Sequence, residues 1–213
     1  MIHEEMTVHK ALAELKTLDS RIQKAVRQGV YVTCKRHSDT KISGVNVSDY
    51  CTKTMQAGYD SAVDLIRRRN AIKRAVVLSN AKTEVVVAGE KYTVAEAIDM
   101  KNHGLDGDVL LLSTMESQYA AVVHNINQNS GDILQKKAEN YVAGMFGGKD
   151  KVDGEEAKKQ MADYITANTY EQVDPLRIQD KIKALDEHIS AFMAEVDGAL
   201  STSNALTTIE INY

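Results

Sequence analysis

The sequence predicts a mainly α-helical protein, built as an elongated antiparallel helical bundle or coiled coil with a small β-hairpin and a C-terminal strand. Long segments carry apolar residues at alternating steps of three and four, the spacing of helical seams. One Pro, 12 Gly, no Trp and 5% aromatic residues favour long helices over a strand-rich sandwich. A nine-residue pattern also occurs twice. We therefore predict a single elongated domain over residues 1–213.

The first and last helices have the clearest seams. The first runs from about Thr7 to Gln28 and ends at Gly29. Its apolar residues are Val8, Ala11, Leu15, Leu18, Ile22 and Ala25. The last begins at Asp174-Pro175, because Asp caps free amides and Pro is preorganised for the first helical turn. Its apolar residues are Ile178, Ile182, Leu185, Ile189, Phe192, Val196 and Ala199.

Residues 29–47 are predicted to form a polar loop containing a short strand at Val30–Cys34. Ser48 is the expected N-cap of a second helix that reaches Ser79. We expect this helix to pack beside the first.

A β-hairpin is predicted over residues 84–93, with its turn at Ala88-Gly89-Glu90. Thr93 and Glu96 then form a capping box that starts another helix. We expect that helix to bend around Gly104 and Gly107.

The helical pattern continues to a second irregularity near Asn129-Ser130-Gly131. It stops in a predicted loop over residues 147–154. A short helix is expected from about Glu155 to Ala167.

The repeated pattern reads Ser-Asn-Ala-x-Thr-x-[Val/Ile]-x-[Val/Ile] and covers Ser79–Val87 and Ser203–Ile211. The same shift of 124 residues aligns Leu65 with Ile189, Ile72 with Val196, Ala75 with Ala199 and Val76 with Leu200. The repeating unit is thus a helix that leads into a half-buried strand, with Asn in the left-handed conformation at the helix end. The second copy predicts a terminal strand over residues 204–213.

The order of these elements resembles that of the septicolysin-like family of small bacterial helical proteins. The matching residues are Ala11-Leu12-Ala13-Glu14-Leu15 with Arg21-Ile22, Asn80-Ala81-x-Thr83, Thr93-Val94-Ala95-Glu96-Ala97-Ile98, Leu185-Asp186, Asn204 and Thr207-Thr208. The resemblance covers most of the chain but not about Gln118 to Tyr170, where extra helical material is expected. It implies a helical, oligomer-forming protein, and the family name alone suggests membrane disruption. The sequence is also similar in style to phage-encoded proteins, which favours a virion component.

The amino-acid composition argues against nucleic acid and a membrane as partners. The chain has 26 Lys and Arg against 30 Asp and Glu, a formal net charge of -4 without global attraction to nucleic acid. No secretory signal follows Met1–Glu5, and apolar stretches such as Val109–Leu112 are too short to span a membrane. We expect a cytoplasmic protein when synthesised, with incorporation in a phage particle as one destination, and neither nucleic acid nor a membrane as a partner. Cys34 and Cys51 are expected to be buried, or else to form a redox pair.

Catalytic chemistry finds no support in the residue spacing. The six histidines include no i, i+4 pair and no zinc motif. Ser79 and Ser203 lack the flanking glycines of a nucleophile elbow. We predict no enzyme activity, no metal and no cofactor.

One basic cluster is a candidate for anion binding. It consists of Arg67, Arg68, Arg69, Lys73 and Arg74. Such a cluster could hold a nucleotide, a nucleic acid or another anion on one helix face. A helix spreads these residues around its circumference, so a solvated or salt-bridged face is the interpretation we favour.

The helical seams and the terminal strand favour self-association. Both need a partner, either within the chain or in a neighbouring subunit. The leading hypothesis is a non-enzymatic structural or assembly protein that forms a homo-oligomer, with other virion proteins as further candidate partners. The residues expected to pack or to oligomerise are Leu15, Leu18, Ile22, Ile182, Leu185, Ile189, Phe192, Val196, Ile209 and Ile211. The alternative is a regulatory module that binds an anion on the basic cluster.

Overall fold

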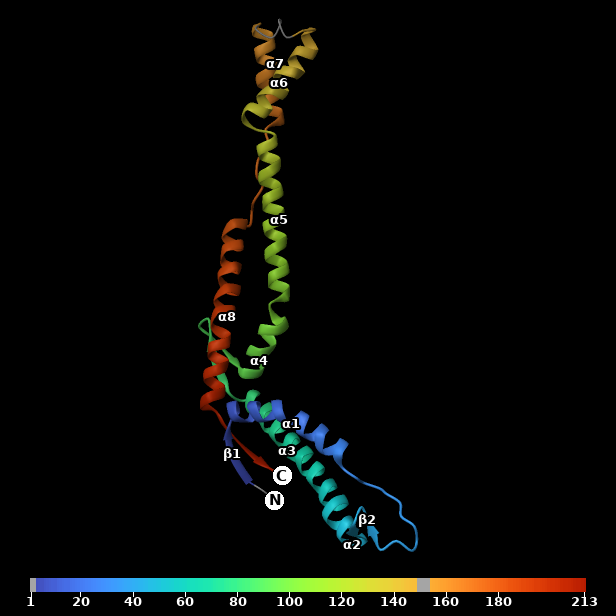
Figure 1. Cartoon of the computed structure of the whole chain (residues 1–213). Helices are drawn as coiled ribbons and strands as arrows, with labels where there is room; N and C mark the ends of the chain where they lie inside the picture. Colours follow the sequence, from blue (N-terminus) through green and yellow to red (C-terminus); the bar gives the residue numbers. More distant parts are fainter. Residues whose placement is uncertain (1–2, 149–153) are drawn as a thin grey trace. The chain divides into compact units, whose positions relative to one another are not determined.

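A computed structural model describes residues 3–148 and 154–213 of the chain. The protein is mainly helical, and its described strands form three two-stranded antiparallel sheets (Figure 1). Its contacts divide it into two compact units, because residues 105–190 contact mainly one another. The sheet unit comprises Met1–Gly104 with Ala191–Tyr213, and the helical unit comprises Leu105–Ser190.

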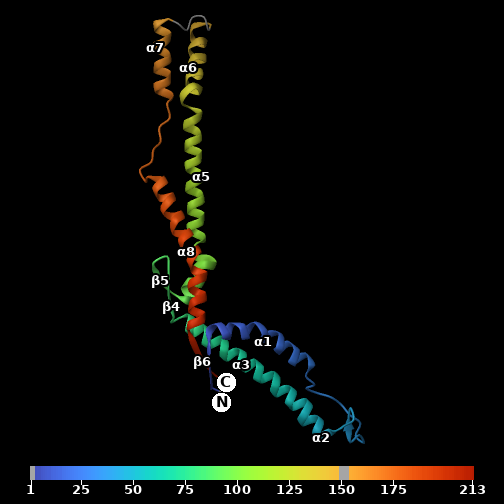
Figure 2. The same ribbon diagram turned by 60° about the vertical axis from the view of Figure 1, so that its left-hand side comes forward.

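Helices α1 (Val8–Gln28) and α3 (Ala57–Asn80) lie side by side in the sheet unit (Figures 1 and 2). α1 begins at Val8 because the preceding Thr7 is extended and its hydroxyl accepts a hydrogen bond from the Lys10 amide at 3.2 Å. The buried side chains of the α1 seam contact those of α3; they are Val8, Ala11 and Leu18 on α1 and Ile72 and Val76 on α3. The first predicted seam is therefore used in part within the chain.

The segment between these helices differs from the prediction. Val30–Cys34 is not a strand: it pairs with no segment among the described residues, and Val32 is 84% exposed. A strand needs a hydrogen-bonding partner, which this segment lacks. The short strands are instead β2 (Lys41–Ile42) and β3 (Val45–Asn46).

The second helix starts two residues earlier than predicted. α2 (Val47–Tyr50) follows Asn46 directly, so Ser48 lies inside the helix rather than at its N-cap. The π-helical segment η1 (Cys51–Gln56) joins α2 to α3.

Strands β4 (Glu84–Val87) and β5 (Glu90–Thr93) form a hairpin over the predicted residues. Ala88 and Gly89 both have positive φ, of 51° and 81°, as a two-residue hairpin turn requires. The following helix α4 (Val94–Asp99) carries the capping box of Thr93 and Glu96. Near the predicted bend, the chain forms the π-helical segment η2 (Met100–Gly104).

The two ends of the described chain form the third sheet. Strand β1 (His3–Thr7) pairs with β6 (Thr208–Asn212), which follows α8 (Ile178–Leu206) after the single residue Thr207. The predicted terminal strand thus starts at Thr208, and residues 204–206 remain helical. Ile209 and Ile211 of β6 are buried in the same cluster as Met6 of β1.

In both copies of the repeated pattern a helix leads into a strand, although α3 ends at Asn80 whereas α8 continues to Leu206. Val85 and Val87 are buried at the positions that Ile209 and Ile211 occupy in the other copy. The Thr83 amide donates to the Ser79 carbonyl at 2.8 Å, and the Thr207 amide donates to the Ser203 carbonyl at 2.9 Å. Asn80 and Asn204 are helical, which corrects the expected left-handed conformation. The threonine amides satisfy the serine carbonyls without a left-handed residue.

The structural repeat is longer than the sequence repeat. Val94 donates its amide to the Thr83 carbonyl at 2.8 Å, and Val8 donates its amide to the Thr207 carbonyl at 2.9 Å. Ala97 and Ala11, each three residues further on, are both fully buried. Each copy therefore consists of a helix, a strand, its antiparallel partner and a second helix. A two-residue turn joins β4 to β5, whereas β6 and β1 come from opposite ends of the chain.

The helical unit contains α5 (Asp106–Gln128), α6 (Gly131–Phe146), α7 (Glu155–Asn168) and the first turns of α8. α6 packs against α7, where the Tyr141 and Tyr164 ring centroids are 4.7 Å apart. The irregularity predicted near residues 129–131 separates α5 from α6. Gly147 ends α6 in the left-handed conformation, but most of the predicted 147–154 loop lies outside the described residues.

The start of α8 lies three residues after Pro175. Both carboxylate oxygens of Asp174 accept from the Ile178 amide, at 3.0 and 2.9 Å. The Asp174 side chain therefore caps the first amide of α8, but Pro175 lies outside the helix, which corrects the expectation that it occupies the first helical turn.

Replacing Ile211 by Ala should destabilise the sheet unit by about 2–5 kcal/mol, because it removes a buried side chain of the terminal strand. Denaturant unfolding followed by circular dichroism would measure this loss. Val86→Ala is the control, since Val86 is 57% exposed and its replacement should cost less than about 1 kcal/mol. Equal losses in the two variants would contradict the role assigned to β6.

Candidate functional site

Arg68 of the predicted basic cluster lies among acidic and aromatic side chains. Its Nη1 donates to Glu4 Oε2 at 2.7 Å and to the Tyr213 hydroxyl at 2.5 Å. Its Nη2 donates to Glu14 Oε2 at 2.8 Å, and its Nε donates to the other oxygen of Glu14. We call these four residues the Arg68 cluster. They come from α3, β1, α1 and the residue that follows β6.

Charge attraction in the Arg68 cluster holds α3 to β1, to α1 and to the end of the described chain. Hydrogen bonds from Arg68 lower the pKa of Glu4 and of Glu14 below their ordinary value. The same bonds raise the pKa of Arg68, whose side chain is only 19% exposed. The guanidinium carbon also lies 5.3 Å from the centroid of the Tyr213 ring, within cation–π distance. Two carboxylates already neutralise this arginine, so it is a poor site for a further anion.

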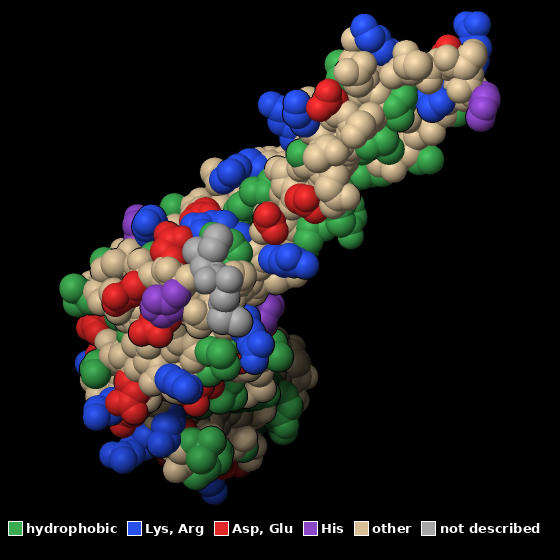
Figure 3. All heavy atoms as spheres, turned by 90° about the horizontal axis from the view of Figure 1, so that it is seen from below, with side chains coloured by type: hydrophobic (Ala, Val, Ile, Leu, Met, Phe, Trp, Pro, Cys, Tyr) green, Lys and Arg blue, Asp and Glu red, His purple; other side chains and the backbone are tan. Residues whose placement is uncertain are grey.

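The other basic residues do not converge on one point. Arg69 contacts Asp19 at 2.9 Å, and Arg67 lies 3.7 Å from Asp64 on an exposed face. Lys73 and Arg74 are exposed. Basic and acidic side chains are also interspersed over the face drawn in Figure 3.

Lys73 belongs to the best candidate for an anion site in the sheet unit. This is an open groove of about 700 Å³ between α1 and α3. His9, Lys16 and Arg69 also line it, together with the acidic Asp19. The groove is therefore partly neutralised.

The ten residues predicted to pack or oligomerise fall into two groups. Those buried within the chain are Leu18, Phe192, Val196, Ile209 and Ile211. Those only half-buried are Leu15, Ile22, Ile182, Leu185 and Ile189. Phe192, for example, contacts Tyr92 edge to face, with centroids 5.6 Å apart. The buried group is committed to the fold of one chain, so only the half-buried group retains surface for another subunit.

Helix α5 carries exposed apolar side chains, and none of them is among the predicted site residues. None of the side chains over its 23 residues is buried. Leu111 is 52% exposed and Val122 is 39% exposed, while Met115 and Tyr119 are half-buried. These four residues follow the spacing i, i+4, i+8 and i+11, which places them on one flank of the helix. We call them the α5 strip.

The α5 strip borders an apolar groove of about 430 Å³ inside the helical unit. Leu111 and Met115 line it from α5, and Ala184 and Leu185 line it from α8. The remaining lining residues are Leu176, Ile178, Lys181 and His188. The groove thus has an apolar floor with two basic groups among its lining residues.

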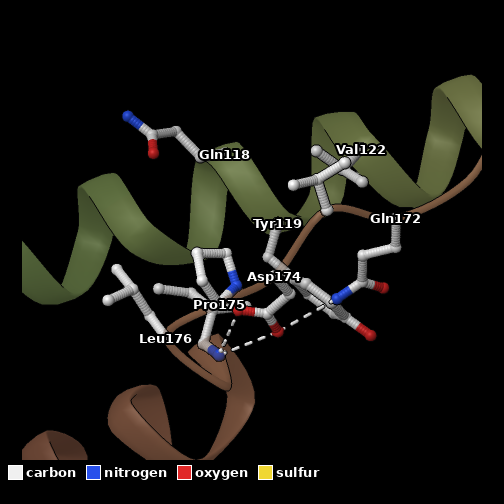
Figure 4. Close-up of a pocket in the computed structure, with 9 residues that line it drawn as sticks. Gln118, Tyr119, Val122, Gln172, Asp174, Pro175 and Leu176 are labelled. Carbon is white, nitrogen blue, oxygen red and sulfur yellow. Dashed lines mark hydrogen bonds between the residues drawn. The ribbon is translucent and has the colours of Figure 1, made fainter.

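A smaller pocket of about 180 Å³ continues along the strip (Figure 4). Tyr119 and Val122 face the segment that contains Pro175. The carboxylate in this pocket is already bonded: Asp174 caps α8 and also accepts from Gln172 Nε2 at 3.1 Å. The Asp174 carboxylate thus holds the segment between α7 and α8 against the start of α8.

The described residues contain no group of three or more His, Cys, Asp and Glu side chains placed to hold a metal ion. Across the same residues, no helix is long and apolar enough to cross a membrane. Cys34 and Cys51 are free and exposed, which corrects their expected burial. Both thiols are exposed because Cys34 lies in the segment without strand pairing and Cys51 begins η1, which has no buried residue.

Neither a protein-family model, nor a curated protein, nor a solved structure matches the chain. The resemblance to the septicolysin-like family therefore stays a prediction.

Acid should weaken the sheet unit through the Arg68 cluster. Because the pKa values of Glu4 and Glu14 are lowered on folding, their contribution is complete above the ordinary value of 4.5. It is lost as the pH falls through the lower folded values. Denaturant unfolding at a series of pH values should show a clearly weaker acid dependence in Arg68→Gln than in the wild type.

Arg67→Gln is the matched control, since Arg67 makes only an exposed contact with Asp64. Glu96, whose pKa is lowered by hydrogen bonds from Thr93, should contribute equally in all three proteins. An Arg68→Gln protein with the full acid dependence of the wild type would contradict the assignment.

Proposed function

We propose that this protein is a non-enzymatic structural protein that assembles into a homo-oligomer through the α5 strip. The observation that carries the proposal is the complete lack of buried side chains along α5. Such a helix gains little stability from its own chain, because helices in proteins are stabilised mainly by packing of an apolar face.

Apolar exposure extends beyond the α5 strip within the helical unit. Val109, Leu110, Val173 and Leu176 are 49%, 68%, 91% and 63% exposed. Exposed apolar side chains that gather on one unit favour protein association. Ile182 and Leu185 at the start of α8 are only half-buried and face the same need for a partner.

A second copy is the partner that best fits this surface. Two α5–α8 pairs could cover each other's apolar flanks, and together they would form an antiparallel helical bundle. Each copy supplies the same excess of apolar side chains, so a two-fold contact satisfies both surfaces at once. The predicted bundle would then be a property of the oligomer.

The anion-binding alternative has less support. Arg67, Arg68 and Arg69 each contact a carboxylate, which leaves Lys73 and Arg74 as the main sources of charge. Loss of phosphate or oligonucleotide binding in Lys73→Glu with Arg74→Glu, at unchanged assembly, would favour that alternative.

Light scattering behind size exclusion should give a mass that is a multiple of the single-chain mass. Replacing Leu111 and Val122 together by Glu should weaken association by at least about a hundredfold, or about 2.7 kcal/mol, because charged groups would be buried at the contact. Ser117→Glu is the control, since Ser117 is an exposed polar residue of the same helix. A wild-type protein that stays monomeric at all concentrations would overturn the proposal.

A further inference from the structure

The two structural repeats differ in how their sheets are closed. The β4–β5 sheet is closed covalently by the turn at Ala88 and Gly89. The β1–β6 sheet has the equivalent register, with Met6 opposite Ile209 where Tyr92 lies opposite Val85. No turn connects β6 to β1. The second sheet therefore depends on noncovalent contacts alone.

The contacts that hold the two sheets also differ in kind. Phe192 of α8 packs edge to face against Tyr92 of β5. The 124-residue shift that aligns the two copies of the repeated pattern places Arg68 at the position of Phe192. Arg68 binds Glu4 of β1 and the Tyr213 hydroxyl through charge and hydrogen bonds. The aligned position therefore makes an ionic contact at the sheet that lacks a turn, and an aromatic contact at the hairpin.

The exposed face of the β1–β6 sheet carries a repulsive pair of side chains. Glu5 lies directly opposite Glu210, and both side chains are exposed. Like charges in directly opposed positions destabilise a strand pair. The equivalent pair in the hairpin is Val86 and Lys91, which does not repel.

We propose that β6 is a releasable strand held by the Arg68 cluster, and that a released β6 pairs with β1 of a second copy of this chain. The partner is a second copy because the site is shaped for this strand: Ile209 and Ile211 are buried with Met6, Ile72 and Val76. The same strand from another molecule makes the same contacts, which is the usual basis of segment exchange. This contact is independent of the α5 strip and survives if that surface does not associate.

Disulfide trapping between strands tests this exchange. Cys34 and Cys51 are first replaced by Ser, and two chains are then made, one with Glu5→Cys and one with Glu210→Cys. Directly opposed residues of an antiparallel pair lie within disulfide range. The two chains are mixed, warmed to just below the unfolding transition, cooled and oxidised, and the products are identified by peptide mass spectrometry.

We expect a disulfide-linked dimer that joins position 5 of one chain to position 210 of the other. A mixture of Val86→Cys and Lys91→Cys chains is the matched control, because the turn keeps those strands together and should prevent exchange. Adding Arg68→Gln to both test chains should raise the yield of the mixed dimer several-fold, whereas adding Arg67→Gln should leave it unchanged.

A yield of mixed dimer no greater than that of the hairpin control would overturn the proposal, provided that one chain carrying both Glu5→Cys and Glu210→Cys closes its own disulfide. If Arg68→Gln prevents folding, the mixture with Arg68 intact still decides the question. The experiment also separates the two proposals. Leu111→Glu with Val122→Glu removes the α5 contact without touching β1 or β6, so strand exchange should persist in that variant.

Discussion

The pairing of β1 with β6 is the contact on which the sheet unit depends. It brings residues from both ends of the chain onto α1 and α3, where Met6, Ile209 and Ile211 complete the apolar cluster. Arg68 reinforces this arrangement from α3, because its guanidinium spans Glu4 and Glu14 and reaches Tyr213. A single side chain of α3 therefore contacts β1 and α1 near one end of the chain and the residue after β6 at the other.

Local sequence signals predicted local structure well. The capping box of Thr93 and Glu96 and the hairpin over residues 84–93 are decided by neighbouring residues, so the sequence alone could locate them. Strand β1 was missed because His3–Thr7 has no alternating apolar pattern, and only its partner β6 makes it a strand. Val30–Cys34 is the opposite case: its residue types suit a strand, but the fold supplies no partner.

The candidate surfaces also include features that the sequence could predict and features that depend on residues distant in the chain. Burial of Leu18, Phe192 and Val196 follows from helical periodicity, and the sequence identified these positions. Periodicity cannot distinguish a seam that is covered within the chain from one that stays open, so it did not identify α5 as the open helix. The pairing of Arg68 with two glutamates could not be predicted from the sequence, since Glu4 and Glu14 are more than fifty residues away along the chain.

The single residue between α8 and β6 has a mechanical consequence. A helix advances with a period of 3.6 residues and a strand with a period of two, and here Thr207 alone separates the two periods. Rotation of the last turn of α8 about its axis would move Ile209 and Ile211 off the core face of the sheet. The end of α8 and β6 are therefore closely coupled, and release of β6 requires the backbone at Thr207 to change conformation. The junction between α3 and β4 is longer, with three residues from Ala81 to Thr83, and the amides of all three bond to carbonyls at the end of α3.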